Sequence, residues 1–386
     1  MTNTQHHNLP TRDLYFIGLI FIISRIFFYL IGYFGALNFN VESILIPEVN
    51  LNTIFTRDIW NAFCQFDCSW FKNIVDLGYE TYPHGLTTGH GASWAFFPFY
   101  SKLGGIIGNL FNLNAVYGFY IITNISTLLA LVLFYLCIRK LSYDVDTARF
   151  GVLLLAFSPY SVYLVATYTE STFLLFTMVA FLGIYSQKWF YTLLAGVCMT
   201  ATRNIGVMMV FPVLMNYIKD IGLKNLFTIS DDTYRTVITI MFIPLPIFAF
   251  MYYLYHLTGD AFAFKNVQIA WNRIFGNPIM YWTQGFSVGG KGIYLSIVTM
   301  IGWLINLYLI RKKHYSEALF MFICTLIPLT TSINAMPRYI FGLYPTYLAI
   351  TIGVKNQYSR IGILLCSTII ATFMIIAWVN AKFFTT

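Results

Sequence analysis

The sequence predicts an all-α, polytopic membrane protein, and its composition and its apolar stretches carry this prediction. Of the 386 residues, 58% are hydrophobic and only 10% are charged, whereas soluble domains average about 25% charged residues. Apolar stretches of about 18 or more residues recur along the chain, and each is long enough to cross a hydrocarbon core of about 30 Å as a helix. The alternating segments of about ten residues that membrane β-barrels use do not occur. We therefore expect one integral-membrane domain over residues 1–386.

The apolar stretches divide the chain into about nine full spans and one interrupted segment. The interrupted segment, 189–218, contains Thr200-Ala201-Thr202-Arg203-Asn204. It is either a re-entrant hairpin or two short helices that meet near Arg203, and the second arrangement would raise the count of helices to about eleven. The full spans are expected near residues 14–37, 115–138, 148–166, 169–186, 237–256, 293–310, 318–331, 339–354 and 361–380.

The positive charges predict how the chain is oriented. The formal net charge is +8, and Lys and Arg occur in short clusters between spans, as the positive-inside rule requires of cytoplasmic loops. This distribution argues against a nucleic-acid partner. With these clusters inside, the N-terminus is cytoplasmic and the C-terminus is external. The polar segment 1–13 leads directly into a full-length span, so we expect a retained anchor and not a cleaved signal peptide.

Two polar stretches then fall outside the cytoplasm, at 38–113 and 259–291. Acidic residues outnumber basic ones in the first half of the earlier stretch. Within it, segment 96–110 is apolar but cannot cross the membrane without reversing every later span. Its Pro98 and its glycines indicate an amphipathic helix on the external interface.

Asp67 is the first candidate for chemistry. It lies in Phe66-Asp67-Cys68-Ser69-Trp70, and aromatic neighbours disfavour the charged carboxylate, which suits a general base. The alternative is a solvated acid or a partner of Lys72. Cys64 and Cys68 flank this motif, and a disulfide between them would need awkward geometry at this spacing.

Glu170 is a second acid near the external surface. It follows Pro159, which breaks the preceding helix, within Tyr168-Thr169-Glu170-Ser171. Acids at the end of a membrane span are usually functional or paired. The alternative is a helix start, with Thr169 as the cap and Glu170 in the first turn.

Arg203 and Arg338 are the candidate phosphate ligands. A charge at the depth of Arg203 costs about 2.5–3.5 kcal/mol, so it either binds an anionic lipid phosphate or pairs with Glu170 or Asp67. Arg338, in Met336-Pro337-Arg338-Tyr339, opens a span on the external side and is suited to bidentate phosphate contacts. The alternative for Arg338 is a side chain that extends to the membrane interface.

The second external stretch contributes candidate ligand contacts. If residues from Gly259 onward form one helix, Phe264, Gln268 and Trp271 share a face of it. Gln268 and Arg273 could then contact a ligand, or the stretch could be a plain interfacial anchor.

Taken in order, these motifs resemble the PIG-V-like family, the second mannosyltransferases of GPI-anchor synthesis and their prokaryotic relatives. The resemblance rests on six motifs: Asp67 with Trp70-Phe71 and Gly78-Tyr79, Trp94-Ala95-Phe96-Phe97-Pro98, Phe157-Ser158-Pro159 with Tyr168-Thr169-Glu170-Ser171, Ala201-Thr202-Arg203, Gly259-Asp260 through Arg273, and Met336-Pro337-Arg338-Tyr339. Where the family has Trp-Asp in the first loop, this chain has Phe66-Asp67. The compact length favours a prokaryotic plasma membrane over the endoplasmic reticulum.

The resemblance implies a GT-C fold and an inverting transfer of a hexose, mannose in this family, from a polyprenyl-phosphate sugar to a lipid or glycan acceptor. Asp67 would be the base, with Glu170 as a second catalytic acid, and Arg203 and Arg338 would bind the donor phosphate. No metal or cofactor is implied, and an accessory membrane subunit stays open. The substrate-binding residues would be Trp70, Trp94, Tyr168, Gln268, Trp271 and Arg273.

Two other functions are compatible with these residues. A transporter or flippase of a lipid-linked or anionic solute would line its path with Arg203 and Glu170, near the midplane. A non-catalytic scaffold subunit would not need Asp67. Asp67 on a loop and Arg338 at the end of a span favour the enzyme.

Overall fold

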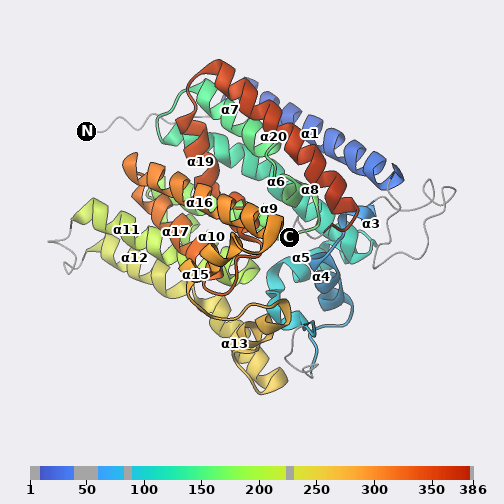
Figure 1. Ribbon diagram of the computed structural model, residues 1–386. Coiled ribbons are helices and arrows are strands. Elements are labelled where there is room, and N and C mark those ends of the chain that lie inside the picture. The colour runs from blue at the N-terminus through green and yellow to red at the C-terminus, as the bar shows by residue number, and fades with distance from the viewer. Residues whose placement is uncertain (1–8, 39–59, 82–88, 223–229, 383–386) are drawn as a thin grey trace.

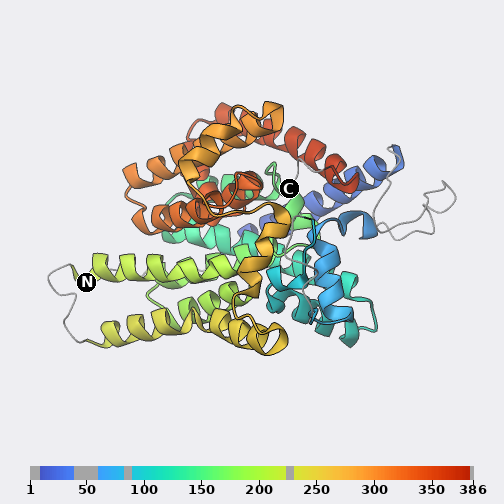
Figure 2. The same cartoon turned by 60° about the horizontal axis from the view of Figure 1, so that its bottom comes forward.

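A computed structural model describes residues 9–38, 60–81, 89–222 and 230–382, and every regular element in these ranges is a helix. Long helices lie side by side along a common direction, with short helices and turns gathered toward one end (Figures 1 and 2). The predicted all-α class is therefore confirmed.

Five of the helical segments are long and apolar enough to cross a membrane. Three shorter apolar helices, α9 (Glu170–Tyr185), α10 (Trp189–Thr202) and α17 (Tyr315–Leu329), pack among them. A helix of 15 residues is about 22 Å long, so length alone does not make these three full spans. The five long segments are α1 (Thr11–Asn38), α6 (Ala115–Lys140), α12 with α13 (Asp231–Phe242 and Leu245–Thr258), α16 (Gly289–Arg311) and α20 (Gln357–Val379).

Two of the expected spans are broken. The stretch predicted at 148–166 contains α7 (Val145–Ala156) and the short α8 (Val162–Val165), because Pro159 lies between them and cannot continue a helix. The stretch predicted at 339–354 contains the end of α18 (Met336–Phe341) and then α19 (Tyr344–Gly353).

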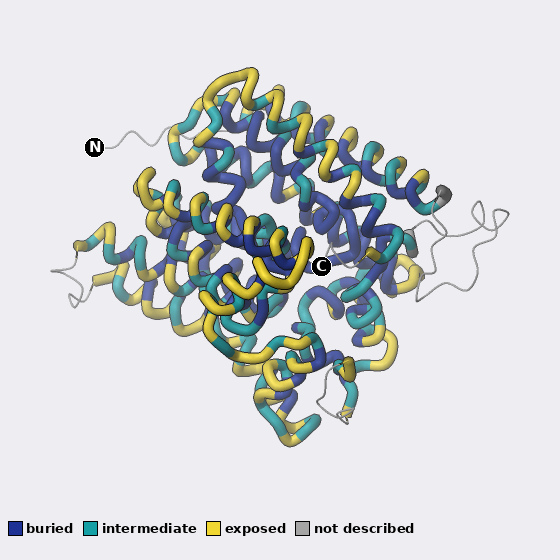
Figure 3. The backbone as a smooth tube through the Cα atoms, in the orientation of Figure 1, coloured by how far each residue is buried: buried dark blue, intermediate teal, exposed yellow. Residues whose placement is uncertain are grey.

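The outer faces of the long helices are apolar, as a lipid environment requires. On α20, Leu365, Ile369 and Phe373 are 61–69% exposed, and their spacing places them on one face of the helix. The buried residues lie toward the centre of the bundle (Figure 3). A stripe of this kind is stable only against an apolar surrounding, so the chain is an integral membrane protein.

Contacts at the two ends of the bundle show how its first and last helices are oriented. At one end, which we call the basic end, Arg149 pairs with Asp13 at the start of α1, and Arg360 at the start of α20 donates to Thr147. At the other, which we call the loop end, the indole of Trp378 near the end of α20 donates to the carbonyl of Phe63 (3.2 Å). α1 and α20 therefore both run from the basic end to the loop end.

The interrupted segment is a pair of helices. α10 ends at Thr202, and the backbone of Arg203 is extended (φ −150°, ψ 136°). The 3-10 helix η2 (Asn204–Met209) and then α11 (Val210–Ile221) lead the chain back. The segment therefore contains two α-helices, and Arg203 lies at the break between the first of them and η2.

The loop end is built from the two polar stretches. The first supplies α3 (Trp60–Phe63), α4 (Asp67–Asp76), η1 (Ser93–Ala95) and α5 (Pro98–Leu110), and the beginning of this stretch lies outside the described residues. The second supplies α14 (Ala263–Asn266), η4 (Val267–Trp271) and α15 (Pro278–Gly285). The single helix expected from Gly259 onward is wrong, because an α-turn passes into a 3-10 helix that ends at left-handed Asn272 (φ 55°).

Candidate functional site

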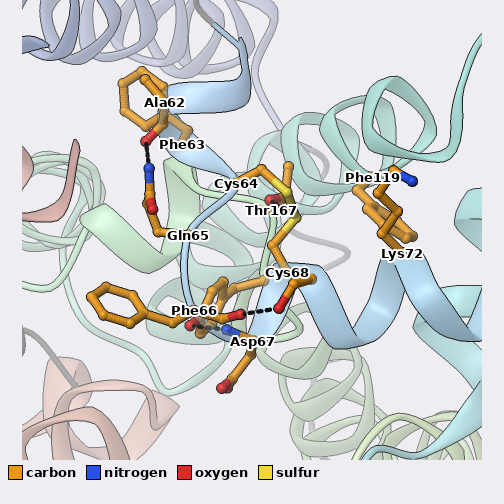
Figure 4. The surroundings of a disulfide bond; sticks show 12 residues. Ala62, Phe63, Cys64, Gln65, Phe66, Asp67, Cys68, Lys72, Phe119 and Thr167 are labelled. Atoms are coloured by element: carbon orange, nitrogen blue, oxygen red, sulfur yellow. Dashed lines mark hydrogen bonds between the residues drawn. A yellow bond between two sulfur atoms is a disulfide. The ribbon is translucent and has the colours of Figure 1, made fainter. Parts of the chain in front are cut away.

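Asp67 is held at the start of α4 by an unusual local backbone. The preceding residue, Phe66, has φ 50° and ψ −110°, a conformation that is strained for a bulky side chain. Cys64 and Cys68 are joined by a disulfide with a Cα–Cα distance of 5.1 Å. A separation of four residues, for which the sequence predicts awkward geometry, is therefore compatible with a bond. Figure 4 shows the Asp67 carboxyl directed away from this disulfide.

The segment that precedes Glu170 in the sequence holds the Asp67 loop in place through hydrogen bonds. The Tyr168 hydroxyl accepts a hydrogen bond from the backbone N–H of Asp67 (2.9 Å), and Thr167 Oγ1 donates to Cys68 Sγ (2.9 Å). Tyr168 is completely buried. Tyr168 therefore supports the backbone of Asp67, and its expected contact with substrate stays a prediction.

Four charged residues from four parts of the chain form one continuous cluster. Arg338 Nη1 donates to Asp67 Oδ2 (2.8 Å), and Arg338 Nε donates to Glu170 Oε1. Arg203 Nη1 donates to the same Glu170 oxygen. The order of contact is Asp67, Arg338, Glu170, Arg203, and the formal charges of the four sum to zero.

The side chains of the cluster differ in how far they are exposed. Glu170 has a side chain only 3% exposed, whereas the side chain of Asp67 is 23% exposed. Among the described residues, Asp67 Oδ1 receives no hydrogen bond. Asp67 is thus the carboxylate that can meet a ligand, and Glu170 is enclosed by its two arginines. The role of Glu170 as a second catalytic acid stays a prediction.

The breaks in the helices explain why these side chains converge. Glu170 is the first residue of α9 and Thr169 occupies the N-cap position, although the side chain of Thr169 makes no capping hydrogen bond. Arg203 occupies the break between α10 and η2, and Arg338 lies in the first turn of α18 after left-handed Ala335 (φ 62°). Each charge therefore sits at the end of a helix and not on its lipid-facing flank.

A third arginine joins the cluster through a tyrosine. Arg273 Nη1 donates to the Tyr339 hydroxyl (2.7 Å). The guanidinium carbon of Arg203 lies 5.8 Å from the Tyr339 ring centroid, and that of Arg273 lies 5.5 Å from it. Arg273 has no ion pair among the described residues, so it adds a positive charge beside the neutral cluster of four.

An aromatic wall flanks Asp67 on the side of α4. Trp70 stacks on Phe96 (ring centroids 5.8 Å apart) and meets Trp271 edge-on (5.9 Å). Both tryptophans are partly exposed. The sequence motifs that contain Trp70 and Trp271 are more than 200 residues apart along the chain, and the structure brings them together.

Two residues expected to contact substrate, Trp94 and Gln268, make hydrogen bonds within the protein. Trp94 is 2% exposed and its indole N–H donates to the Glu80 carbonyl (2.8 Å), so it is a buried packing residue. Gln268 is partly exposed, and its amide donates to the carbonyl of Phe264 in the preceding turn (3.3 Å). The substrate-binding roles of Trp94 and Gln268 both stay predictions.

Sequence reasoning missed two contributors to this site. Tyr339 lies between Arg203 and Arg273, and its only signal was its position directly after Arg338. Phe66 has the strained backbone at this site. The sequence does not predict it, because bulky aromatic residues rarely adopt a positive φ.

The chain is similar to several solved membrane enzymes. ArnT from Cupriavidus metallidurans bound to undecaprenyl phosphate has a TM-score of 0.53 at 13% identity, over 93% of this chain and 64% of ArnT. The apo state of that protein has a TM-score of 0.50 at 11% identity, over 95% and 76% of the two chains. An oligosaccharyltransferase from Archaeoglobus fulgidus has a TM-score of 0.47 at 18% identity, over 94% and 52%.

These similarities concern the fold. No protein-family model and no curated protein matches the chain, and the chain spans about half of the oligosaccharyltransferase and about two thirds of ArnT. Its helical bundle is nevertheless shared with ArnT over nearly all of its length. The chain has the fold of the GT-C membrane glycosyltransferases.

Proposed function

We propose that this protein is a membrane glycosyltransferase that moves a hexose from a polyprenyl-phosphate sugar to a hydroxyl of a lipid or glycan acceptor. One observation carries the proposal: Asp67 is a partly exposed carboxylate at the loop end, within a cluster of arginines, and its Oδ1 receives no hydrogen bond from the described residues. The GT-C fold supports it, as does the undecaprenyl phosphate bound to ArnT. Mannose as the sugar rests on the resemblance to PIG-V-like proteins.

In the proposed reaction, Asp67 accepts the proton of the acceptor hydroxyl as that oxygen attacks the anomeric carbon. The bond between the anomeric carbon and the phosphate oxygen breaks, and its electron pair stays on the lipid phosphate. Attack from the face opposite the phosphate inverts the configuration of the sugar. A phosphate leaving group needs no proton, so a single base is sufficient.

The arginines have a distinct role in this scheme. In the resting cluster Arg338 is shared by Asp67 and Glu170. When Asp67 takes up a proton it becomes neutral, and Arg338 loses one of its two anionic partners. The positive charge released in this way is balanced by the negative charge that develops on the phosphate. Such stabilisation is strong at a site from which water is largely excluded.

A cavity near Arg203 suits the hydrocarbon chain of the donor. It has a volume of about 330 Å³ and lies between α5, α10 and α13. Ala201, in the last turn of α10, forms part of its wall, and Arg203 follows two residues later. Lys102 is the one charged residue among those that line it, and the others are Tyr79, Pro98, Ala201, Pro246, Ala249, Phe250 and Tyr253.

The grouping of charges also bears on the transporter alternative. A transporter needs its charged residues along a path, near the midplane, with access from both sides. Asp67, Glu170, Arg203 and Arg338 instead lie together at the loop end, in direct contact with one another. We therefore favour an enzyme that works at one membrane face.

Replacing Asp67 tests the proposed function directly. We expect Asp67→Asn, in purified protein reconstituted into lipid vesicles, to slow sugar transfer from a radiolabelled polyprenyl-phosphate mannose by about 10²–10⁴-fold, because the general base is lost. Asp76→Asn, which changes an exposed acid paired with Lys72 on the same helix, is the matched control and should retain activity. Full activity in Asp67→Asn would rule out this mechanism.

A further inference from the structure

A second cavity lies at the basic end of the molecule, between α10 and α12. Its volume is about 430 Å³, within the range of known small-molecule sites. It lies at the start of α10, whose other end leads to Arg203. Because α10 has 14 residues, about 21 Å of helix separates this cavity from Arg203. The lining residues are Gln187, Lys188, Trp189, Phe190, Tyr191, Leu193, Arg235, Ile238 and Thr239.

The cavity carries two available cations. Lys188 makes no ion pair among the described residues, and its Nζ lies 5.9 Å from the centroid of the Tyr191 ring. Arg235 Nη1 lies 3.7 Å from Asp232 Oδ1, but both side chains are 60% exposed. Exposed ion pairs of this kind contribute little to stability. Asp232 lies outside the lining, and none of the lining residues is acidic. The cavity therefore favours an anion.

Apart from Gln187 and Thr239, the rest of the lining is apolar, and part of it is exposed on the outside of the bundle. Phe190 is 71% exposed and Ile238 is 48% exposed. The hydroxyl of Thr239 is committed to the carbonyl of Arg235 (2.7 Å) and so adds no polarity. An anion with a hydrocarbon chain would satisfy both parts of the cavity, with its charge at Lys188 and Arg235 and its chain against the aromatic and aliphatic side chains.

We propose that this cavity binds an anionic phospholipid, with its phosphate between Lys188 and Arg235 and an acyl chain along Phe190 and Ile238. Basic pockets between membrane helices on the cytoplasmic side commonly bind such headgroups. A zwitterionic lipid would bring a quaternary ammonium group into a cavity that offers two cations and no carboxylate. The proposal is independent of the reaction at the loop end.

Native mass spectrometry of the full chain in detergent tests this site. Phosphatidylglycerol and phosphatidylcholine with identical acyl chains are added separately, and the lipid retained per protein is counted. We expect wild-type protein to retain phosphatidylglycerol preferentially. The variant Lys188→Gln with Arg235→Gln should bind phosphatidylglycerol about tenfold more weakly, because each cation near a headgroup contributes to affinity.

Two further variants make the result decisive. Lys312→Gln with Lys313→Gln removes two positive charges at the same end of the molecule but outside the cavity, and should bind like wild type. Lys188→Arg with Arg235→Lys keeps both charges and should also bind like wild type, which separates loss of charge from loss of folding. Equal retention of the two lipids by wild type, or undiminished binding by the glutamine variant, would overturn the proposal.

Discussion

At the scale of single residues, Glu170 determines how the charged cluster is arranged. One of its oxygens accepts hydrogen bonds from both Arg203 and Arg338, and the carboxylate is 3% exposed. A buried ion pair adds little net stability when it forms, but losing one partner leaves an uncompensated buried charge. Here a single carboxylate serves two arginines, so its loss would leave Arg203 without an ion-pair partner and Arg338 with Asp67 alone.

This arrangement predicts that Glu170→Gln destabilises the protein. We expect a loss of about 3–5 kcal/mol in the free energy of unfolding, seen as a lower melting temperature in detergent, together with loss of activity. Asp67→Asn serves as the comparison, because it leaves Arg338 paired with Glu170 and should lower stability much less. A melting temperature for Glu170→Gln equal to that of wild type would refute this account of Glu170.

At the scale of elements, the loop that carries Asp67 is tied down at several points. The Cys64–Cys68 disulfide brackets Phe66 and Asp67, and the indole of Trp378, on the last helix, donates to the carbonyl of Phe63. The Phe66 ring also meets the Trp378 ring edge-on at 5.2 Å. A strained Phe66 persists because these neighbours leave the backbone no alternative.

Removing the disulfide should therefore lower both activity and stability. For Cys64→Ser with Cys68→Ser we expect transfer to fall about tenfold or more, since small displacements of a catalytic group have large kinetic effects. The unfolding free energy should fall by about 2 kcal/mol, because the closed loop is very short. A reducing agent should reproduce the kinetic effect in wild type but not in this variant. Cys366→Ser, an exposed free cysteine on α20, is the control, and unchanged transfer in the double variant would disprove the positioning role.

The helix α7 depends on a polar cap at the basic end. Asp144 accepts hydrogen bonds from the Thr147 backbone N–H (2.7 Å) and from Thr147 Oγ1 (3.0 Å). The backbone hydrogen bond is the largest cause that lowers the pKa of Asp144 below its ordinary value. Because the pKa is lower in the folded state, the cap contributes stability above the unfolded pKa and loses it as pH falls through the folded pKa.

We therefore expect Asp144→Ala to lower the free energy of unfolding by about 1 kcal/mol at neutral pH. The difference from wild type should shrink below about pH 4, where the ordinary carboxyl of the unfolded chain begins to bind protons. Thermal unfolding in detergent at several pH values measures both effects. Asp146→Ala changes an exposed acid in the same first turn that is not the cap, and a loss as large as that of Asp144→Ala would contradict the assignment.

At the scale of the whole molecule, the distribution of charge suggests how the bundle lies in the membrane. Arg139, Arg149, Arg311 and Arg360 occur at helix ends near the basic end, whereas the loop end holds the Asp67 cluster. By the positive-inside rule, the basic end and the N-terminus would face the cytoplasm. The proposed reaction would then take place on the opposite face.

This orientation predicts which lysines a membrane-impermeant amine reagent reaches in intact cells. Lys72, on α4 at the loop end, has a side chain 44% exposed and should be labelled from outside. Lys312, exposed at the end of α16, should be labelled only after permeabilisation. Peptide mass spectrometry reads both sites in one sample, and the reverse pattern of labelling would invert the topology and place the loop end in the cytoplasm.

Local patterns in the sequence account for much of the fold. The helical class follows from the length of the apolar stretches, and the break near Arg203 follows from polar residues within one of them. Prediction was weaker where the backbone departs from regular geometry. The 3-10 helix after Asn266 and the strained Phe66 depend on contacts made by distant segments, and local propensity does not describe those contacts.

The sequence by itself determined the membrane class, the helical content, the clusters of basic residues and the short set of charged residues worth testing. These properties follow from hydrophobic length and charge, which can be evaluated along the chain. Only the tertiary structure decided which candidates are buried and which pair with one another. Glu170 joins two arginines that lie 33 and 168 residues away, Tyr168 and Trp94 are buried, and Asp67 Oδ1 receives no hydrogen bond from the described residues. Burial and pairing are set by which helices pack together, and no local pattern of residues specifies that packing.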